Sequence, residues 1–346
     1  MRCRRLAYVW ALVMLLTLSP ATAAAKSGTS WAQAELKTVV AAGIMAKAAA
    51  ARPDGPLTQG ELEGVVAGLT HTQAAVPPSP AAKVTMAALD ARLVAALGLT
   101  DSAKLFTQSA RTAGLAPPSR FGTEAVARLL GLRTNHPAAL DAIELSPGQP
   151  ATHAEAAYSA ARMLKLGEAN TQGIQELAAS FLLPALTPWQ TKVLKTAVRF
   201  IGYPYVWGGE SEFPQSSLWQ FGPQVHGGFD CSGFVWRVYK VEQYPDGGVL
   251  PDTLQGRTTY AMSGEVPAAE RILFANLQPA DVIFFGAKGP KSKATQIDHA
   301  GVYLGNGWFI HSSGYGVAVT TLSGWYAKRF AWARRPLAEA GLVSPA

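Results

Sequence analysis

The sequence changes character near residue 185, and this change restricts the chain to a fold with two different parts. Residues 26–185 are rich in alanine and leucine, and their apolar residues recur at the spacing of helices. From Gly202 onward glycine and aromatic residues become frequent, and short β-type runs appear between residues 281 and 311. We therefore predict an all-α domain over residues 26–185 and a mixed helix-and-sheet domain over residues 186–346.

Helix-start signals divide the first part into several helices. Thr58 and Glu61, and again Thr152 and Glu155, have the spacing of a capping box. We expect helices over residues 31–46, 58–69, 85–97, 102–114, 123–132 and 152–166. At the boundary between the two parts, Thr187 is a suitable N-cap for a helix that starts with proline.

Residues 1–25 have the composition of a secretory signal peptide. Three arginines precede an apolar stretch, Leu6 to Leu18, and small residues suited to cleavage follow it. The stretch is short for a membrane span, and no later segment is apolar enough for one. We therefore predict a secreted protein of the cell wall or periplasm, with no stable membrane insertion after the signal is removed.

The charge and the metal-binding residue types argue against several classes of protein. The formal charge of +7 becomes +4 when the three arginines of the signal are subtracted, which suits an anionic wall surface without requiring one. No basic run is interleaved with aromatic residues, so we expect no nucleic-acid partner. With one cysteine outside the signal and no H-E-x-x-H pattern, we expect neither a zinc site nor another cofactor.

Cys231 is the only cysteine that remains once the signal is removed. A lone thiol in an exported protein is either a small buried side chain or a nucleophile. Asp230 is a good N-cap, and apolar residues follow Cys231 at the spacing of one helical face. Cys231 is therefore expected in the first turn of a helix, where free N–H groups and the helix dipole lower a thiol pKa and favour the thiolate.

Two histidines downstream favour the nucleophile. Gly305-Asn306-Gly307, a strong hairpin signal, lies between His299 and His311. A two-residue turn at Asn306-Gly307 would put the two histidines on opposite faces of the sheet. A three-residue loop pairs Gly301 with His311 and makes the histidines diagonal neighbours, about 7 Å apart. We predict this longer loop, with a glycine in a left-handed conformation, so that His311 orients His299 as the base.

Five short segments of the second part stand out for their composition and their order: residues 201–209, 230–235, 250–251, 277–285 and 299–311. They resemble the NlpC and P-sixty family of bacterial cell-wall cysteine peptidases. The resemblance implies a papain-like α+β fold, with the cysteine on a helix and histidines on a neighbouring antiparallel sheet. It implies that Cys231 is the nucleophile, His299 the base and His311 the residue that orients the base. It also implies that Tyr205 lies near the oxyanion.

Residues 210–229 lengthen the segment before the nucleophile, where the family commonly has far fewer residues. A loop of this length is unusual without a function or a structure of its own. It contains Phe213, Trp219 and Phe221, which either form a wall of the substrate groove or pack on the core as a surface insertion. We assign Trp219, with Asp230 and Ser232 beside the nucleophile, to the substrate and oxyanion region.

Three segments of the first part contain helices that begin in a similar way: residues 31–69, about 82–99 and 147–166. They resemble diverged S-layer homology repeats, a resemblance that implies binding to an anionic cell-wall polymer. Gln59, Met86 and His153 stand where that family has arginine. The alternative is a helical domain that only supports the second part.

These features together predict a secreted endopeptidase that acts on peptidoglycan stem peptides. The family resemblance implies cleavage beside a γ-D-glutamyl linkage to a diamino acid. Two alternatives stay open: an amidase or acyltransferase of the same fold on another wall or lipid amide, and a non-catalytic wall-binding protein.

Overall fold

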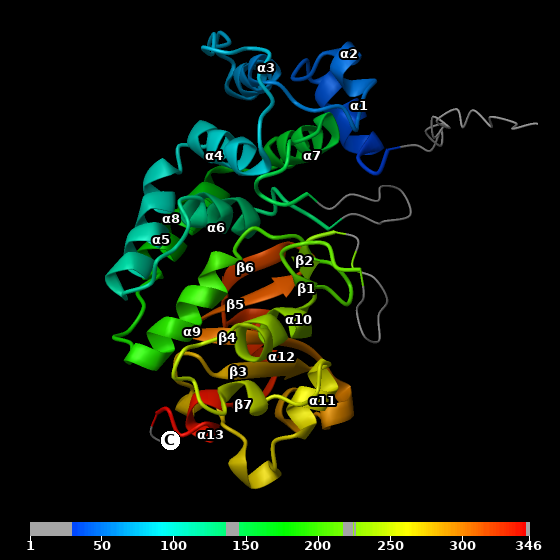
Figure 1. Ribbon diagram of the computed structural model, residues 1–346. Coiled ribbons are helices and arrows are strands. Elements are labelled where there is room, and N and C mark those ends of the chain that lie inside the picture. The colour runs from blue at the N-terminus through cyan, green and yellow to red at the C-terminus, as the bar shows by residue number, and fades with distance from the viewer. Residues whose placement is uncertain (1–29, 136–144, 217–223, 225, 344–346) are drawn as a thin grey trace, which may run out of the picture.

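The computed structural model describes residues 30–135, 145–216, 224 and 226–343 (Figure 1). The predicted signal, residues 1–25, lies outside the described residues, and so do Trp219 and Phe221.

The described chain before residue 181 is helical and gathers at one end of the molecule (Figure 1). Its helices are α1 (Gln33–Ala41), α2 (Lys47–Ala50), α3 (Gln59–Thr70), α4 (Met86–Ala96), α5 (Thr100–Thr112), α6 (Phe121–Leu129), α7 (His153–Met163) and α8 (Glu168–Ser180). All but α2 and α8 were predicted from the sequence. The first predicted helix ends early, at Ala41, because the chain turns at Gly43 with a φ of +71°, a conformation that terminates helices.

Three of these helices begin at one closed ring of backbone hydrogen bonds. The N–H of Leu57 donates to the carbonyl of Ala151 at 2.7 Å, Ala151 donates to Val84 at 2.8 Å, and Val84 donates to Leu57 at 2.9 Å. Each of these buried residues immediately precedes the threonine that caps α3, α4 or α7. The three segments that resemble S-layer homology repeats therefore enter their helices in the same way, while their membership of that family stays a prediction.

The positions that correspond to the arginine of S-layer homology repeats are largely closed to solvent. Met86 and His153 are buried, and only Gln59 is partly exposed. One ring nitrogen of His153 lies 2.8 Å from the carbonyl of Arg52, and the other lies 3.2 Å from the Glu61 carboxylate. Two of the three positions are thus engaged in holding the helices together.

The chain then continues through α9 (Pro188–Arg199), whose Thr187 cap and first-position proline match the prediction. A five-stranded antiparallel sheet follows, with the strand order β6-β5-β4-β3-β7. Its strands are β3 (Val282–Gly286), β4 (Ile297–Gly305), β5 (Trp308–Ser313), β6 (Gly316–Thr321) and β7 (Phe330–Arg334). Strands β6 and β7 were not predicted. A separate ribbon pairs β1 (Glu210–Ser211) with β2 (Gly228–Phe229).

Short helices cover this sheet. They are α10 (Cys231–Trp236), which continues as a π-helical turn (Arg237–Val241), α11 (Thr259–Gly264), α12 (Gly324–Arg329) and α13 (Pro336–Glu339), with single 3-10 turns at 250–252, 268–270, 274–276, 289–291 and 294–296. Helix α10 contacts both β4 and β5, and α11 contacts β4. The mixed helix and antiparallel sheet agree with the predicted class for the second part.

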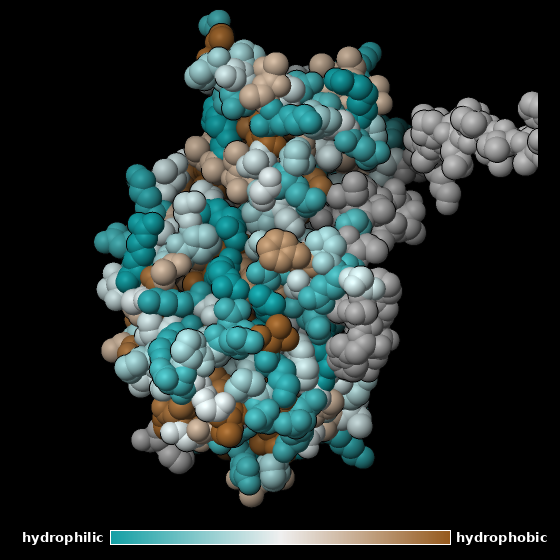
Figure 2. All heavy atoms as spheres, in the orientation of Figure 1, coloured by the Kyte–Doolittle hydropathy of each residue, from teal (hydrophilic) through white to brown (hydrophobic). Residues whose placement is uncertain are grey.

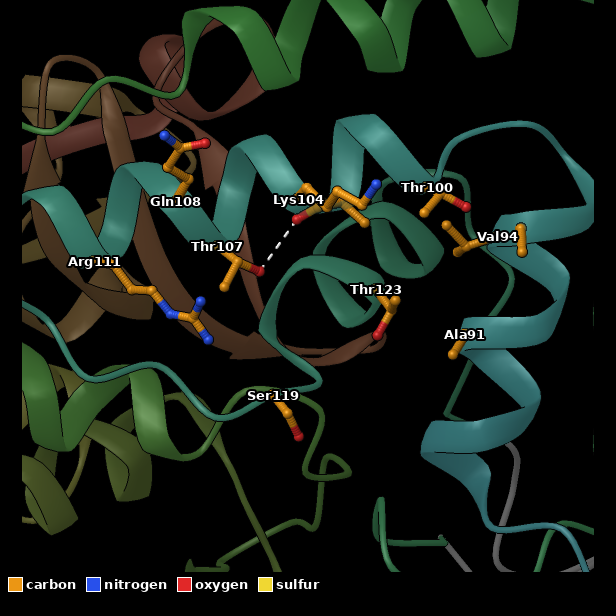
Figure 3. A pocket seen from close by; sticks show the side chains of 11 residues that line it. Ala91, Val94, Thr100, Lys104, Thr107, Gln108, Arg111, Ser119 and Thr123 are labelled. Atoms are coloured by element: carbon orange, nitrogen blue, oxygen red, sulfur yellow. Dashed lines mark hydrogen bonds between the residues drawn. The ribbon is translucent and has the colours of Figure 1, made fainter.

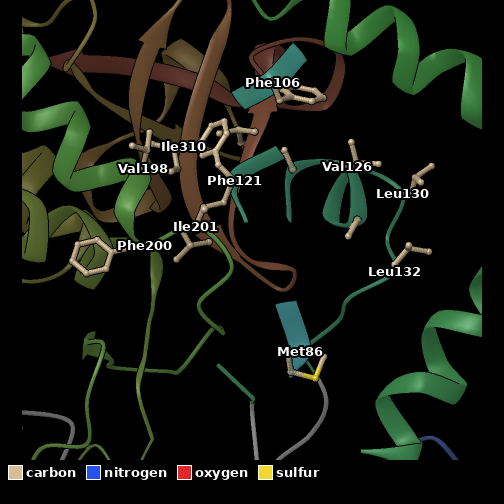
Figure 4. Packing of buried hydrophobic residues seen from close by; sticks show 14 of the residues in the cluster. Met86, Phe106, Phe121, Val126, Leu130, Leu132, Val198, Phe200, Ile201 and Ile310 are labelled. Atoms are coloured by element: carbon tan, nitrogen blue, oxygen red, sulfur yellow. The ribbon is translucent and has the colours of Figure 1, made fainter. Parts of the chain in front are cut away.

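One hydrophobic core runs through the helical half and the sheet. Phe181, at the end of α8, lies 5.0 Å from the ring of Phe106 on α5 and 5.0 Å from the ring of Trp308 on β5. Figure 4 shows Phe106, Phe121 and Ile310 in the same cluster. The domain boundary at residues 185 and 186 stays a prediction, and the two parts on either side of it share buried apolar surface.

A buried ion pair also joins the halves. Arg128 and Glu124 on α6 lie 3.0 Å apart, and the Arg128 guanidinium donates to the carbonyl of Gly202 at 2.6 Å and to that of Tyr315. Gly202 has a φ of +91°, and a Cβ there would lie only 2.6 Å from the Glu124 carboxyl group. Because removal of either charge would leave the other buried and unpaired, this contact fixes α6 against the sheet half.

No helix in the described ranges has the length and apolar character needed to cross a membrane. The face seen in Figure 2 is mostly hydrophilic, and hydrophobic residues are scattered over it rather than gathered in one band.

The shared core predicts that the two halves unfold together. Phe181→Ala removes a fully buried ring from the junction and should lower the free energy of unfolding by about 3–5 kcal/mol. Urea unfolding followed by far-UV circular dichroism and by tryptophan fluorescence should show one transition, shifted equally for both probes. The neighbouring Leu182→Ala is the matched control, since Leu182 is 64% exposed. Two separate transitions, with only one shifted, would contradict the shared core.

Candidate active site

The helix that carries the cysteine begins at the predicted residue. Asp230 is the N-cap of α10, and its carboxylate accepts the N–H of Gly233. The other carboxylate oxygen accepts the N–H of Gly208 at 3.0 Å. Cys231 therefore lies in the first helical turn, where it is 9% exposed and faces β4.

The protonation state of the thiol differs from the prediction. Burial, followed by the neighbouring Asp230 carboxylate, raises the pKa of Cys231 to about 12. The N–H groups of Ala300 and Ser232 and the charge of Arg257 act in the opposite direction but do not outweigh burial. The predicted resting thiolate is therefore wrong, because the helix start is enclosed by protein and the thiol is neutral at pH 7.

The hairpin between β4 and β5 closes differently from the prediction. Asn306 and Gly307 form a two-residue turn with φ values of 48° and 77°, and Gly305 pairs with Trp308. The predicted three-residue loop is thus wrong. The register shifts between Tyr303 and Gly305, so a bulge in β4 supplies the extra residue that the longer loop would have provided.

Beyond the bulge the register is the predicted one. Val302 pairs with Ile310, which puts Gly301 opposite His311. A Cβ on Gly301 would lie 3.1 Å from the Cβ of His311, so glycine leaves the room that the imidazole occupies. His299 and His311 therefore share one face of the sheet, as the sequence analysis requires.

The two histidines are in direct contact. His299 Nε2 lies 2.7 Å from His311 Nδ1. Because this contact occupies Nε2, the nitrogen of His299 that remains to take a proton from a thiol is Nδ1. The productive tautomer has His299 Nε2–H donating to His311 Nδ1, which leaves the Nδ1 lone pair of His299 open. Cys231 lies close to this strand, because its sulfur accepts a hydrogen bond from the backbone N–H of Ala300, the residue after His299 on β4.

Aromatic side chains enclose the histidine pair. The His311 ring lies 4.7 Å from Phe309 and 5.3 Å from Tyr326, and the His299 ring lies 5.6 Å from Phe285. Tyr326 comes from α12, and no sequence motif pointed to it, whereas Phe285 ends the segment 277–285 but was given no role there. Such side chains hold the imidazoles in place by packing, and this role depends on a tertiary contact that local patterns do not encode.

Burial keeps both imidazoles neutral. It lowers the pKa of His299 to about 4, and it lowers the pKa of His311 well below its usual value, with the neighbouring His299 adding to the effect. A neutral His311 can accept the His299 Nε2–H bond and stabilise an imidazolium that forms during reaction. At rest the thiol at the start of α10 is neutral, and so are the two imidazoles on β4 and β5.

Tyr205 lies beside the start of the cysteine helix. Its backbone forms an isolated parallel β-bridge with Phe229, the residue before Asp230. Burial, and then the neighbouring Cys231 and Asp230, raise the pKa of Tyr205 above its usual value, so its hydroxyl keeps its proton. A protonated phenol at this position is a hydrogen-bond donor suited to a developing oxyanion.

Asp230 and Ser232 are engaged within the protein. The Ser232 hydroxyl lies 3.0 Å from the Asp230 carboxylate, and Arg257 donates to both groups at 3.0 and 2.8 Å. Through these contacts both residues stabilise the first turn of α10. Arg257 was missed by the sequence analysis because it lies in an irregular segment between α10 and α11, with no spacing that marks it.

The insertion before the nucleophile has an ordered root. Strands β1 and β2 pair Glu210 with Phe229, and the buried amide of Gln224 donates to the carbonyls of Ser211 and Gly228 at 2.8 and 3.0 Å. Phe213 is 66% exposed, so it does not pack on the core. The role of the insertion as a wall of the substrate groove stays a prediction, as does that of Trp219.

A hollow in the helical half lacks the side chains for this chemistry. A hollow of about 560 Å³ lies between α4, α5 and α6, with Lys104, Thr107 and Arg111 in its wall (Figure 3). No cysteine or histidine lines it. Within the described ranges, no three histidine, cysteine, aspartate or glutamate side chains are grouped to hold a metal ion.

Comparison with known proteins agrees with the geometry of the sheet half. Residues 202–335, less than half of the chain, match the model of the NlpC/P60 family, a family of cysteine peptidases. Residues 202–335 form an NlpC/P60 domain. The match includes the cysteine helix, the histidine hairpin and the segment of Arg257.

Curated relatives match this NlpC/P60 domain over a limited length. A probable endopeptidase of Mycobacterium tuberculosis is 33% identical over 38% of this chain and 25% of its own length. A γ-D-glutamyl-L-lysine dipeptidyl-peptidase of Bacillus subtilis is 28% identical over 42% and 41%. A probable peptidoglycan endopeptidase of Bacillus subtilis is 31% identical over 42% and 34%. The chain thus spans about a quarter of the mycobacterial relative.

A crystal structure of an NlpC/P60 family protein from Bacillus cereus is 25% identical in sequence. It covers 45% of this chain and 41% of its own, with a TM-score of 0.32.

The raised thiol pKa predicts slow alkylation at neutral pH. The rate of iodoacetamide labelling of Cys231 should rise about tenfold per pH unit from pH 7 to beyond pH 9, because only the thiolate reacts. Mass spectrometry of the protein without residues 1–25 gives the rate, and Cys231→Ala gives the background. A flat rate between pH 5 and 8 would contradict the neutral resting state, since it would indicate a thiolate paired with an imidazolium.

Proposed function

We propose that this protein is a secreted cysteine endopeptidase that hydrolyses amide bonds in peptidoglycan stem peptides. The observation that carries the proposal is the arrangement of Cys231 at a helix start beside β4, with His299 and His311 hydrogen-bonded on one face of the sheet. A nucleophile, a base and a group that orients the base are the set that acyl transfer requires. The match of residues 202–335 to the model of a cysteine-peptidase family supports the reaction class.

In the proposed first step, Cys231 Sγ attacks the amide carbonyl carbon while His299 Nδ1 takes the thiol proton. Because the free thiol and imidazole are both neutral, proton transfer accompanies attack rather than preceding it. N–H groups at the start of α10 and the Tyr205 hydroxyl stabilise the oxyanion. His311 Nδ1 accepts the His299 Nε2–H and steadies the imidazolium.

In the second step the C–N bond breaks, and the leaving amine takes the proton from His299. The acyl group is then a thioester on Cys231. Water attacks this thioester as His299 Nδ1 accepts a proton from it. The C–S bond breaks, the acid leaves, and the proton returns to sulfur. The reaction needs no further co-reactant.

The proposed substrate class rests on the relatives of the NlpC/P60 domain. Two of them are a probable peptidoglycan endopeptidase and a γ-D-glutamyl-L-lysine dipeptidyl-peptidase. By extension, we propose the bond between γ-D-glutamate and a diamino acid as the site of cleavage. A signal at residues 1–25 would deliver the protein to such a substrate.

Digestion of purified peptidoglycan tests the proposal. The chain without residues 1–25 should release fragments that end in γ-glutamate, identified by mass spectrometry, and Cys231→Ala should release none. Fragments from both proteins would contradict the role of the thiol. Failure of the intact site on peptidoglycan, with turnover of another wall or lipid amide, would favour the alternative amidase or acyltransferase.

The role proposed for His311 predicts a loss in turnover rather than in binding. His311→Ala removes the acceptor of the His299 Nε2–H bond and should lower kcat by about 10²–10⁴-fold, with a smaller change in KM. Steady-state kinetics on a synthetic stem peptide measure both constants. His71→Asn is the control, since exposed His71 has a φ of 55° that asparagine tolerates. A kcat within threefold of the starting protein would remove His311 from the mechanism.

Binding of an anionic wall polymer by the helical half is a separate proposal. It rests on the resemblance of three segments to S-layer homology repeats and on their shared ring of hydrogen bonds. Two of the three arginine-equivalent positions are buried, which argues against contact at those side chains. Sedimentation of Cys231→Ala with cell walls, before and after the anionic polymers are extracted, would detect such binding.

A further inference from the structure

Arg257 lies at the centre of the polar contacts around the cysteine helix. It is 2% exposed, and its guanidinium makes five hydrogen bonds to residues that the structure describes. Nε donates to Glu210 at 2.8 Å, one Nη donates to Asp230 and Ser232, and the other donates to the carbonyls of Gly208 and Gly209 at 3.1 and 3.0 Å. A guanidinium has five N–H donors, so all five are used.

These contacts join Arg257 to two separate segments of the chain, residues 208–210 and 230–232. Glu210 belongs to β1 at the root of the insertion, Gly208 and Gly209 precede it, and Asp230 caps α10. The approach is close, since a Cβ on Gly233 would lie 2.3 Å from the guanidinium and 1.9 Å from the Gly209 carbonyl. The guanidinium therefore fills the space between the start of α10 and the segment that leads into β1.

We propose that Arg257 is a positioning residue for the cysteine of the proposed peptidase reaction. Its guanidinium fixes the first turn of α10 against residues 208–210, and so fixes the sulfur of Cys231 relative to His299. The inference rests on the proposed function for its catalytic consequence but not for its structural content. Through Glu210, the same contact ties the root of the insertion to the nucleophile.

The guanidinium acts in two ways that can be separated. Its planar fork makes five directed bonds, and a lysine has only three donors on a single nitrogen. Its positive charge offsets Asp230 and opposes the rise in the pKa of Cys231. Arg257→Lys keeps the charge and loses the fork, whereas Arg257→Gln loses both.

Three variants test the proposal in the full chain without its signal. Arg257→Lys and Arg257→Gln are compared with Arg335→Lys, which disrupts another buried fork at 2.7 and 3.0 Å from Asp281. Asp281 directly precedes β3 in the sheet half. Its carboxylate accepts hydrogen bonds from Arg335 and from the N–H of Gln278 rather than from the cysteine helix. Thermal melting, kcat and KM on a stem peptide, and the pH profile of Cys231 alkylation are measured for each.

The expected result separates position from stability. Arg257→Lys should lower kcat about 100-fold with KM within about threefold, because a displacement of about 1 Å at the reacting atoms can cost that much. Arg257→Gln should in addition slow alkylation at pH 8 by about threefold or more, since the thiolate loses a nearby positive charge. Arg335→Lys should lower the melting temperature but leave kcat and the alkylation profile unchanged.

Two results would overturn the proposal. The first is a wild-type kcat in Arg257→Lys, or an equal loss of kcat in Arg335→Lys at matched stability. The second is an alkylation profile of folded Arg257→Gln that coincides with that of the starting protein. This second readout needs no peptidase activity, so it tests Arg257 even if peptidoglycan is not the substrate.

Discussion

The side-chain alternation of a β-strand is the constraint on which this site depends. A shift of one residue between β4 and β5 would move His311 to the face opposite His299 and remove their contact. The bulge before Gly305 prevents this shift by adding one residue to a two-residue turn. The hydrogen bond between the histidines and the packing of Tyr326 on them both follow from that register.

Residues of the helical half pack against the same sheet. Phe106 and Phe181 pack on Trp308, which stands at the start of β5 immediately after the turn. Arg128 holds the carbonyl of Tyr315, just before β6, and that of Gly202 before Tyr205. The strands that carry the histidines are therefore fixed on one face by distant helices, so stability of the helical half and geometry of the site are physically linked.

Enclosure of the site has an electrostatic consequence. Burial raises the pKa of the thiol and lowers those of both imidazoles, so the neutral pair is favoured over the ion pair. The same enclosure strengthens each hydrogen bond that a developing charge makes. In an enclosed and neutral site of this kind, the proposed reaction depends on hydrogen-bond donors placed near the oxyanion. It also depends on transfer of the thiol proton while sulfur attacks the carbonyl carbon.

Local signals in the sequence determined the helix starts, the Asp230 cap, the position of Cys231 in a first turn and the shared face of the two histidines. These features depend on neighbouring residues and on strand periodicity, which a sequence displays directly. The true turn, strands β6 and β7, the core shared by both halves and the thiol pKa were decided by the tertiary structure. So was Arg257, whose five partners lie at 208–210, 230 and 232. Burial and long-range contacts have no local pattern, because they depend on which distant residues the fold brings together.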